Sequence, residues 1–130
     1  MQSVKPKVLV IDDDNLVADT LAMVLNVSGY EAIAAYSGER ALELARETAY
    51  DHLVSDVMME PMNGIQLSIA MQALCPECKV LLMSGNNRTA DLLAEACRDG
   101  YTYEILPKPV HPAEILARLR NGTANGLLPN

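Results

Sequence analysis

Short apolar runs alternate along this chain with longer stretches in which apolar residues recur every three or four positions. Uninterrupted apolar runs are typical of strands buried in a parallel sheet, and the wider spacing is typical of amphipathic helices. The predicted strands are Val8–Ile11, Ala32–Tyr36, His52–Ser55, Val80–Met83 and Tyr103–Leu106. The pattern therefore indicates five strands, each followed by a helix.

Each predicted helix begins at residues typical of a helix N-terminus. These starts are Asp14, Ser37, Asn63, Asn86 or Asn87, and His111 with Pro112. Gly29 and Gly100 stand where the first and fourth helices should end, because glycine readily adopts the left-handed backbone that ends many helices. The helices are thus bounded by local signals as well as by periodicity.

Strands that alternate with helices of this length require right-handed crossovers and a parallel sheet covered on both faces. We predict an α/β fold of the flavodoxin-like (βα)5 doubly wound type, with strand order 2-1-3-4-5. Val8–Ile11 and Val80–Met83 are apolar enough to be central strands, whereas the stretch from Glu31 is polar enough to be peripheral. Residues 1–121 should form one domain, followed at 122–130 by a flexible tail or the start of a linker.

Residues suited to phosphate chemistry follow four of the predicted strands. Asp12 and Asp13 follow the first strand, Asp56 the third, Ser84 the fourth and Lys108 the fifth. The carboxyl ends of parallel strands lie on one edge of the sheet, and ligands bind there. We therefore expect these side chains to meet in one pocket, with the three aspartates as neighbours.

Three carboxylates in one pocket repel one another and stay ionised only when positive charge compensates them. An oxygen-only ligand set favours Mg²⁺ as that charge. Lys108 adds a point charge suited to a phosphoryl oxygen. An aspartate beside a metal and a lysine can act as a nucleophile toward phosphorus, and Ser84 can hydrogen-bond the transferred group.

The overall charge narrows the range of partners. The 130 residues carry a net charge of −7 and show no basic stripe, so nucleic acid and anionic membranes are not expected as direct partners. The N-terminus lacks a signal-peptide pattern, and no apolar run approaches the length needed to span a bilayer. We expect a cytoplasmic protein.

Three cysteines form an odd number, which argues against a disulfide framework. Cys75 and Cys78 have C-x-x-C spacing, but a structural zinc site needs four ligands, and His52 and His111 lie at unrelated element ends. A redox pair is a further alternative, although the motif does not follow a first strand. Solvated loop cysteines, with Cys97 apart from the pair, are the favoured interpretation.

Four segments, taken together and in order, resemble the receiver domain of two-component response regulators. They are Val8–Asp13, Leu53–Met59 with Met62–Gly64, Val80–Gly85 and Leu106–Pro109, and the resemblance covers about residues 5 to 120. It implies that Asp56 accepts a phosphoryl group from a sensor histidine kinase or histidine phosphotransfer protein. It further implies a docking switch near the fourth helix and fifth strand, with no catalysis beyond the domain's own phosphorylation and dephosphorylation.

The resemblance also assigns roles to the other residues of the pocket. It implies that Asp13, Asp56 and the backbone carbonyl of Met58 bind Mg²⁺, with Asp12 holding the metal mostly through water. Ser84 and Lys108 would contact the phosphoryl oxygens.

The chain departs from the usual family pattern in three places. Residues 60–64 read Glu-Pro-Met-Asn-Gly, which moves the usual proline by one place and replaces an aspartate, but the loop keeps its length and we expect the site to survive. Ile105 stands where the family usually has an aromatic residue, and Tyr101 or Tyr103 is the candidate replacement. Val110 replaces a frequent phenylalanine, which we interpret as a packing change.

Two alternatives remain open at this point. Asp12-x-Asp14 resembles the first motif of haloacid-dehalogenase-type phosphatases, but the acidic motif expected after Lys108 is reduced to Glu114. The other alternative is a receiver-like module that binds a partner without being phosphorylated. Ile105 and the altered loop leave this alternative open. Mutually repelling carboxylates count against it, because a purely structural domain has no reason to retain them. The chain is either a stand-alone receiver or a receiver cut from a longer protein.

Overall fold

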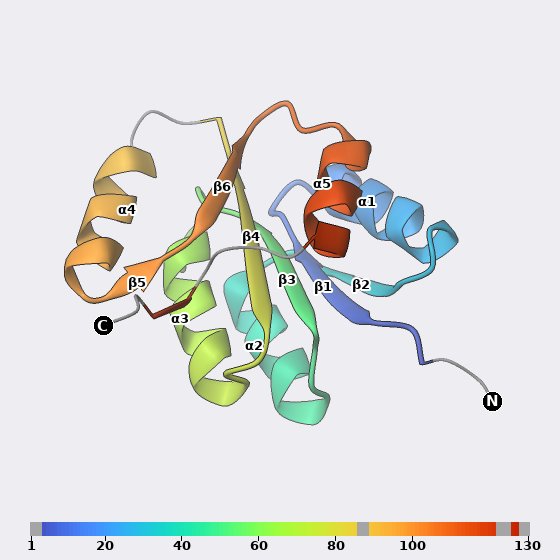
Figure 1. Ribbon diagram of the computed structural model, residues 1–130, viewed down its shortest axis with the longest axis horizontal. Coiled ribbons are helices and arrows are strands. Elements are labelled where there is room, and N and C mark those ends of the chain that lie inside the picture. Colours follow the sequence, from blue (N-terminus) through green and yellow to red (C-terminus); the bar gives the residue numbers. More distant parts are fainter. Residues whose placement is uncertain (1–3, 86–88, 122–125, 128–130) are drawn as a thin grey trace.

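A five-stranded parallel sheet in the order β2-β1-β3-β4-β6 runs through the middle of the molecule (Figure 1). The computed structural model describes residues 4–85, 89–121 and 126–127, the last two by their backbone alone. The strands are β1 Lys7–Ile11, β2 Glu31–Ala35, β3 His52–Asp56, β4 Lys79–Ser84 and β6 Glu104–Pro107. The predicted order 2-1-3-4-5 is confirmed, because β6 is the fifth strand of this sheet, and β2 lies at its edge as expected.

Helices cover both faces of the sheet, as a doubly wound fold requires (Figure 1). On one face lie α1, which spans Asn15–Val27, and α5, which spans Pro112–Asn121. On the other face lie α2 Gly38–Glu47, α3 Gly64–Leu74 and α4 Thr89–Arg98. No helix in the described part of the chain is long and apolar enough to cross a membrane.

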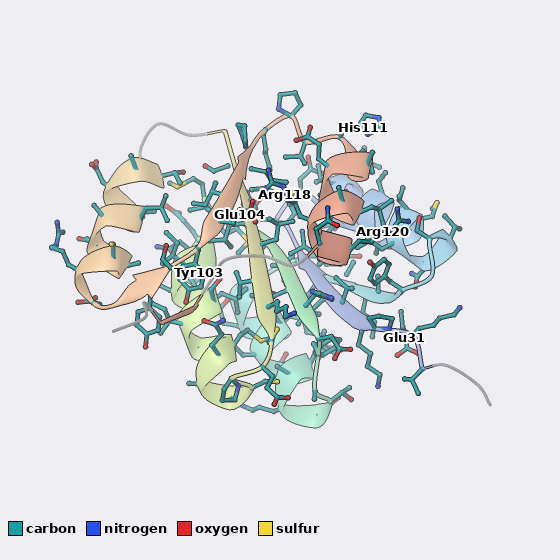
Figure 2. All side chains as sticks on the ribbon, viewed as in Figure 1. Glu31, Tyr103, Glu104, His111, Arg118 and Arg120 are labelled. Carbon is teal, nitrogen blue, oxygen red and sulfur yellow. The ribbon has the colours of Figure 1, made fainter. Side chains whose placement is uncertain are left out.

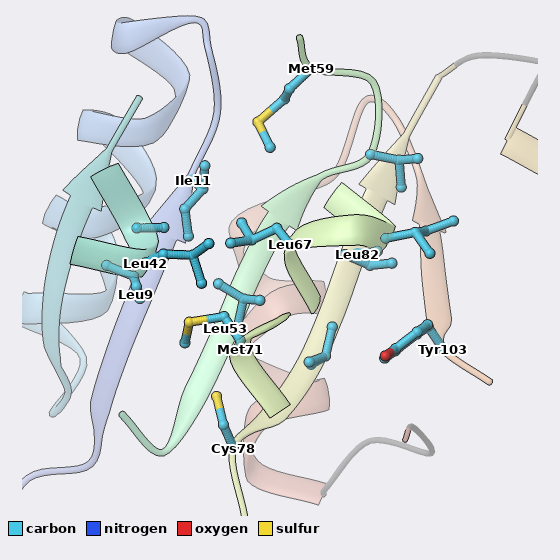
Figure 3. Close-up of a cluster of buried hydrophobic side chains, with 14 of the residues drawn as sticks. Leu9, Ile11, Leu42, Leu53, Met59, Leu67, Met71, Cys78, Leu82 and Tyr103 are labelled. Atoms are coloured by element: carbon cyan, nitrogen blue, oxygen red, sulfur yellow. The ribbon is translucent and has the colours of Figure 1, made fainter. Parts of the chain in front are cut away.

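Side chains that alternate along each strand divide the core into two halves. In β1, Val8 and Val10 belong to the cluster beneath α1 and α5, whereas Leu9 and Ile11 belong to the cluster beneath α2, α3 and α4. All four are fully buried. Figure 3 shows the second cluster, in which strand residues meet α2 and α3 at Leu42, Leu67 and Met71. Strands buried on both faces explain the uninterrupted apolar runs of the sequence.

Polar caps begin the first three helices where the sequence predicts them. Asp14 accepts a hydrogen bond from the backbone N–H of Leu16 at 3.0 Å, and Ser37 caps α2. Asn63 and Gln66 cap each other's backbone N–H at 2.8 and 2.9 Å, which forms a capping box. These local bonds fix the first turn of each helix beside the carboxyl edge of the sheet.

The other helix boundaries follow similar rules. Pro112 is the first residue of α5, and His111 accepts the N–H of Ala113 through Nδ1 at 3.0 Å. Gly29 and Gly100 have φ angles of +102° and +94°, as expected after α1 and α4. The predicted start of the fourth helix at Asn86 or Asn87 lies outside the described residues, and α4 is seen from Thr89 onward.

A second, two-stranded sheet was not predicted. Tyr101–Thr102 forms β5, which pairs antiparallel with β7, Gly126–Leu127. The parallel strand β6 therefore begins at Glu104, one residue later than expected, after the chain has passed through β5. Arg118 of α5 forms an ion pair with Glu104 and so joins that helix to β6 (Figure 2).

The prediction of solvated cysteines is wrong for Cys78. Its side chain is only 1% exposed and belongs to the core cluster beneath α3, whereas Cys75 is half-buried and Cys97 is exposed. The Cys78 N–H donates to the Cys75 carbonyl at 3.1 Å, a tight turn that brings the chain into β4 at this point. Burial raises the pKa of the Cys78 thiol to about 12, so this cysteine acts as a small core residue.

Candidate functional site

Three carboxylates meet at the carboxyl edge of the sheet. Asp12 and Asp13 directly follow β1 and Asp56 ends the neighbouring strand β3, and one oxygen of each lies within 4.8 Å of the others. The expectation that they are neighbours is confirmed. Asp12 and Asp56 are 1% and 7% exposed, whereas Asp13 is open to solvent.

Lys108 lies between the two buried carboxylates. Its Nζ donates to Asp12 Oδ2 at 3.1 Å and lies 3.3 Å from Asp56 Oδ1. The backbone places it there, because Pro107 pairs with Ser84 in the sheet and the Lys108 N–H donates to the Ser84 carbonyl at 3.0 Å. The peptide bond between Lys108 and Pro109 is cis. Asp12 and Lys108, ninety-six positions apart in the sequence, thus belong to one ion-paired group with Asp56.

The charges in this group influence one another. Burial raises the pKa of Asp56, Lys108 opposes that rise, and the neighbouring acids Asp12 and Asp13 add to it. Burial alone would lower the pKa of Lys108, but its hydrogen bond to Asp12 and the charge of Asp56 raise it overall. The site therefore holds a stable ammonium beside a carboxylate that is costly to ionise without further positive charge.

The group suits a hard divalent cation. Three closely spaced carboxylates offer only oxygen ligands, which Mg²⁺ prefers. Burial disfavours the ionised form of Asp56, and a cation would offset that cost. The residues present therefore fit a magnesium ion.

Ser84 ends β4 and is buried beside this group. A hydrogen bond joins its Oγ to Oγ1 of Thr89, the first residue of α4. Thr89 was missed by the sequence reasoning, although a threonine near a helix N-terminus is a recognisable signal. What the sequence could not show is that its hydroxyl reaches Ser84.

Comparison with known proteins identifies the family. A family model described as "Response regulator receiver domain" matches residues 8–120. The chain belongs to the response regulator receiver domains. It is therefore a receiver domain of two-component response regulators.

Curated relatives match over most of this chain. The receiver is 36% identical over 117 residues to "Transcriptional regulatory protein PrrA" of Mycobacterium leprae, covering 88% of this chain and 48% of the relative. It is 32% identical over 116 residues to "Response regulator MprA" of Mycobacterium ulcerans, with the same coverage. The chain spans about half the length of the curated relatives it matches.

Solved structures share the fold over nearly the whole receiver. The Vibrio cholerae chemotaxis protein CheY4 is 27% identical, has a TM-score of 0.79, and is matched over 91% of this chain and 98% of its own. A CheY-like receiver domain protein from Methanospirillum hungatei has a TM-score of 0.81 at 21% identity, over 91% and 93% of the two chains. These likenesses agree with the predicted flavodoxin-like class.

Family membership also argues against the phosphatase alternative. Asp14, which that interpretation needed in the pocket, caps α1 instead. Glu114 lies in the first turn of α5 and is not part of the carboxylate group formed by Asp12, Asp13 and Asp56. The receiver assignment accounts for the same acids without either residue.

The loop after β3 keeps its place despite its unusual sequence. The N–H of Gly64 donates to the Val57 carbonyl at 2.8 Å, and a Cβ on Gly64 would collide with the backbone carbonyl oxygen of Asp56. The peptide bond between Glu60 and Pro61 is cis. The loop therefore packs its backbone directly against that of Asp56, and only glycine fits at position 64.

An open pocket of about 670 Å³ lies beside this loop. Its lining includes Asp13 and Met58, the residue whose backbone carbonyl was assigned to the metal by resemblance. The other lining residues are Met59, Glu60, Pro61, Asn63, Gln66, Asp91, Leu92 and Glu95. The acidic site is thus open toward the gap between α3 and α4.

The geometry argues against Tyr103 as the replacement for the missing aromatic. Tyr103 precedes Glu104, which pairs with Leu81, three residues before Ser84 in β4. That offset is roughly 10 Å along a strand. The Tyr103 hydroxyl donates to Gln72 of α3 at 3.1 Å, and Tyr101 stacks on its ring. Both tyrosines therefore belong to the opposite end of the sheet, where Tyr103 is seen in Figure 3.

Proposed function

We propose that this receiver is a switch operated by Mg²⁺-dependent phosphoryl transfer to Asp56. The donor is the phosphohistidine of a sensor histidine kinase or of a histidine phosphotransfer protein. One observation carries the proposal: Lys108 lies within ion-pair distance of Asp12 and Asp56 at the edge where three carboxylates meet. A domain that only bound partners would have no use for this costly arrangement.

In the proposed reaction a carboxylate oxygen of Asp56 attacks the phosphorus of the donor. An O–P bond forms as the N–P bond breaks, and the bonding electrons return to the leaving imidazole. Lys108 is close enough to neutralise charge on the phosphoryl oxygens, since its Nζ already lies 3.3 Å from Asp56 Oδ1. Ser84 donates its hydroxyl proton to one of those oxygens. The receiver thus catalyses only its own modification and its reversal.

The proposed metal ligands are Asp13, Asp56, the backbone carbonyl of Met58 and, through water, Asp12. When bound, Mg²⁺ neutralises negative charge on the carboxylates and on the transferred group. Burial raises the pKa of Asp56 despite Lys108, which supports this part of the proposal, because a cation would favour the ionised carboxylate.

The donor must approach along a surface that leads to Asp56, and an apolar one lies beside Lys108. A pocket of about 570 Å³ there is lined by Val17, Thr20, Leu21, Met83, Lys108, Pro109, Val110 and Pro112. Along α1, Leu16, Met23 and Val27 are 75%, 66% and 82% exposed at helical spacing. We assign this surface to the donor protein, because Lys108 of the phosphoacceptor site lines its pocket and the exposed side chains of α1 are apolar enough to be covered.

The proposed setting is the cytoplasm, where the three free cysteines would stay reduced. The net charge of −7 supports a protein target rather than direct binding to nucleic acid or an anionic membrane.

The test is intact-mass analysis after incubation with acetyl phosphate, with and without Mg²⁺. We expect a phosphoryl adduct on the wild-type protein that requires Mg²⁺ and is lost in Asp56→Asn. Asp14→Asn is the matched control, because it changes a neighbouring aspartate to another good N-cap and should leave the adduct intact. A folded protein that forms no adduct would overturn the proposal and favour the unphosphorylated docking module.

A further inference from the structure

The hydrogen bond between Ser84 and Thr89 links the proposed phosphoryl site to α4. Ser84 is the last residue of β4 and Thr89 the first of α4, and each is 7% exposed. Both oxygens are thus shielded from water, where a hydrogen bond is strong and a missing partner is costly. The bond joins the last residue of β4 to the first described residue of α4.

α4 is packed less deeply than α3, with Leu92 and Leu93 only partly buried against the core, so a bond at Thr89 matters. Within the described helix only Thr89 and Ala96 are buried, whereas α3 buries five of its residues. Helices with few buried contacts are the ones that shift when a local interaction changes. On its outer side α4 contributes Asp91, Leu92 and Glu95 to the pocket that also contains Asp13.

We propose that the Thr89 hydroxyl is the positioning group that couples phosphorylation of Asp56 to α4. This rests on the proposed function, because it requires Ser84 to donate to the phosphoryl group. A hydroxyl has one proton and two lone pairs. Before phosphorylation either oxygen of the Ser84–Thr89 pair can be the donor. Once Ser84 gives its proton to a phosphoryl oxygen it can only accept, so Thr89 must donate to it.

The phosphoryl group therefore selects one direction in a chain of two hydrogen bonds, from Thr89 to Ser84 to phosphate. That chain holds the first turn of α4 against the site. The neighbouring side chain of β6 cannot do this, because Ile105 has no hydrogen-bonding group and pairs at the level of Leu82. The switch acts on α4 only to the extent that this chain differs in free energy between the two states.

The experiment measures hydrogen exchange of the 89–98 segment by mass spectrometry, with and without acetyl phosphate and Mg²⁺. Intact mass is recorded on the same samples, so that exchange is compared at known phosphorylation. In the wild-type protein we expect phosphorylation to slow exchange in this segment roughly twofold, because the Ser84–Thr89 bond is already present and gains only the strengthening that a second, directed hydrogen bond gives it. Thr89→Val keeps the side-chain shape and removes the hydroxyl, so its adduct should form while the slowing is lost.

Thr89→Ser is the matched variant, because it keeps the hydroxyl, and it should retain the slowing. Thr89→Ala provides a second hydroxyl-free chain if the valine variant does not fold. If the adduct forms and exchange slows equally in wild type and in the hydroxyl-free variants, the coupling role of Thr89 is overturned while the proposed function stands. The same follows if the adduct forms on wild type without any slowing. Absence of any adduct on the folded wild-type protein would overturn the proposed function and this inference together.

Discussion

The two ends of β3 each carry a buried titratable residue, and the protein accommodates them in opposite ways. His52 begins the strand and Asp56 ends it, and they are 9% and 7% exposed. Asp56 faces Lys108 at 3.3 Å. The Nδ1 atom of His52 has no hydrogen-bond partner among the described residues, and its ring meets the edge of Tyr30.

The two ends of β3 differ in whether a nearby opposite charge offsets the cost of burying a charged group. Burial raises the pKa of Asp56 and lowers that of His52, so it disfavours the charged form of both. At the amino end burial lowers the pKa of His52, with only Asp51 opposing it among nearby charges, and the ring lies in the core against Tyr30. At the carboxyl end Lys108 opposes the effect of burial on Asp56, because its positive charge favours the ionised carboxylate. The proposed chemistry uses the carboxyl end, where Lys108 supplies the opposite charge.

The largest expected effect comes from removing the positive charge of Lys108. Lys108→Met leaves Asp12 and Asp56 without their ion-pair partner, so we expect about 2 kcal/mol of lost stability at neutral pH, less than for a fully buried pair because Lys108 is partly exposed. Phosphorylation should slow roughly 100-fold. Denaturant unfolding and intact mass measure the two effects. Lys79→Met is the control, since Lys79 is exposed at the amino end of β4, and equal behaviour of the two variants would contradict the comparison.

Gly64→Ala tests the backbone around Asp56. The added methyl group would collide with the Asp56 carbonyl oxygen and lie 2.9 Å from Cα of Val57, so the loop must shift. We expect a loss of about 2 kcal/mol in denaturant unfolding together with weaker phosphorylation. Gly29→Ala strains a left-handed position with no atom near the added Cβ, and it should lower stability without changing phosphorylation. If Gly64→Ala also leaves phosphorylation unchanged, the close packing is not needed for the site.

The pH dependence of stability should have opposite signs at the two ends. The pKa of Asp56 is raised in the folded protein above its ordinary value of 3.8. Its favourable contribution is therefore present below that value and is lost as pH rises through the folded pKa. In metal-free buffer, wild type should lose stability relative to Asp56→Asn as pH rises from about 4, by at most about 1.4 kcal/mol per pH unit. If the stability difference between wild type and Asp56→Asn does not change with pH, Lys108 fully offsets the effect of burial on Asp56.

His52 should show the reverse dependence. Its pKa is lowered below the ordinary 6.5, chiefly by burial, so the unfolded chain binds the proton more readily. Stability should fall as pH drops below about 6.5, again by at most about 1.4 kcal/mol per pH unit. His52→Leu should remove this slope, and thermal unfolding between pH 5 and 7 measures it. Persistence of the slope in the variant would place the responsible group elsewhere.

The smallest effect is expected at the amino end of the sheet. Tyr103→Phe removes the hydroxyl that donates to Gln72 at 3.1 Å, and should cost about 1 kcal/mol. Phosphorylation and its effect on α4 should be unchanged, because Tyr103 lies far from Ser84 along the sheet. Hydrogen exchange of the phosphorylated variant checks this. A weakened α4 response would restore Tyr103 as a candidate for the switch.

Much of this receiver could be predicted from its sequence. The buried strands and the caps at Asp14, Ser37 and Asn63 follow from periodicity and short-range hydrogen bonding, and the strand order follows from the flavodoxin-like class they indicate. The meeting of Asp12, Asp13 and Asp56 followed from the same rules, because parallel strands share one carboxyl edge. The role of each site residue stays a prediction that phosphorylation experiments must test.

Other features depend on distances that no local pattern encodes. Cys78 looked like a loop residue, but a tight turn places it in the core. β5 and β7 pair across a long stretch of sequence, and two-residue strands leave no periodic signal. Tyr103 was a candidate for the switch until its contact with Gln72 placed it near the other end of the sheet.

The sequence by itself determined the fold class, the strand order and the edge of the sheet where the acids gather, because those depend on periodicity and topology. Only the tertiary structure decided which groups touch. It put Lys108 between Asp12 and Asp56, joined Ser84 to Thr89 and buried His52 with no hydrogen-bond partner for Nδ1 among the described residues. Hydrogen bonds and ion pairs act over about 3 Å, and chain order does not fix side-chain positions to that precision.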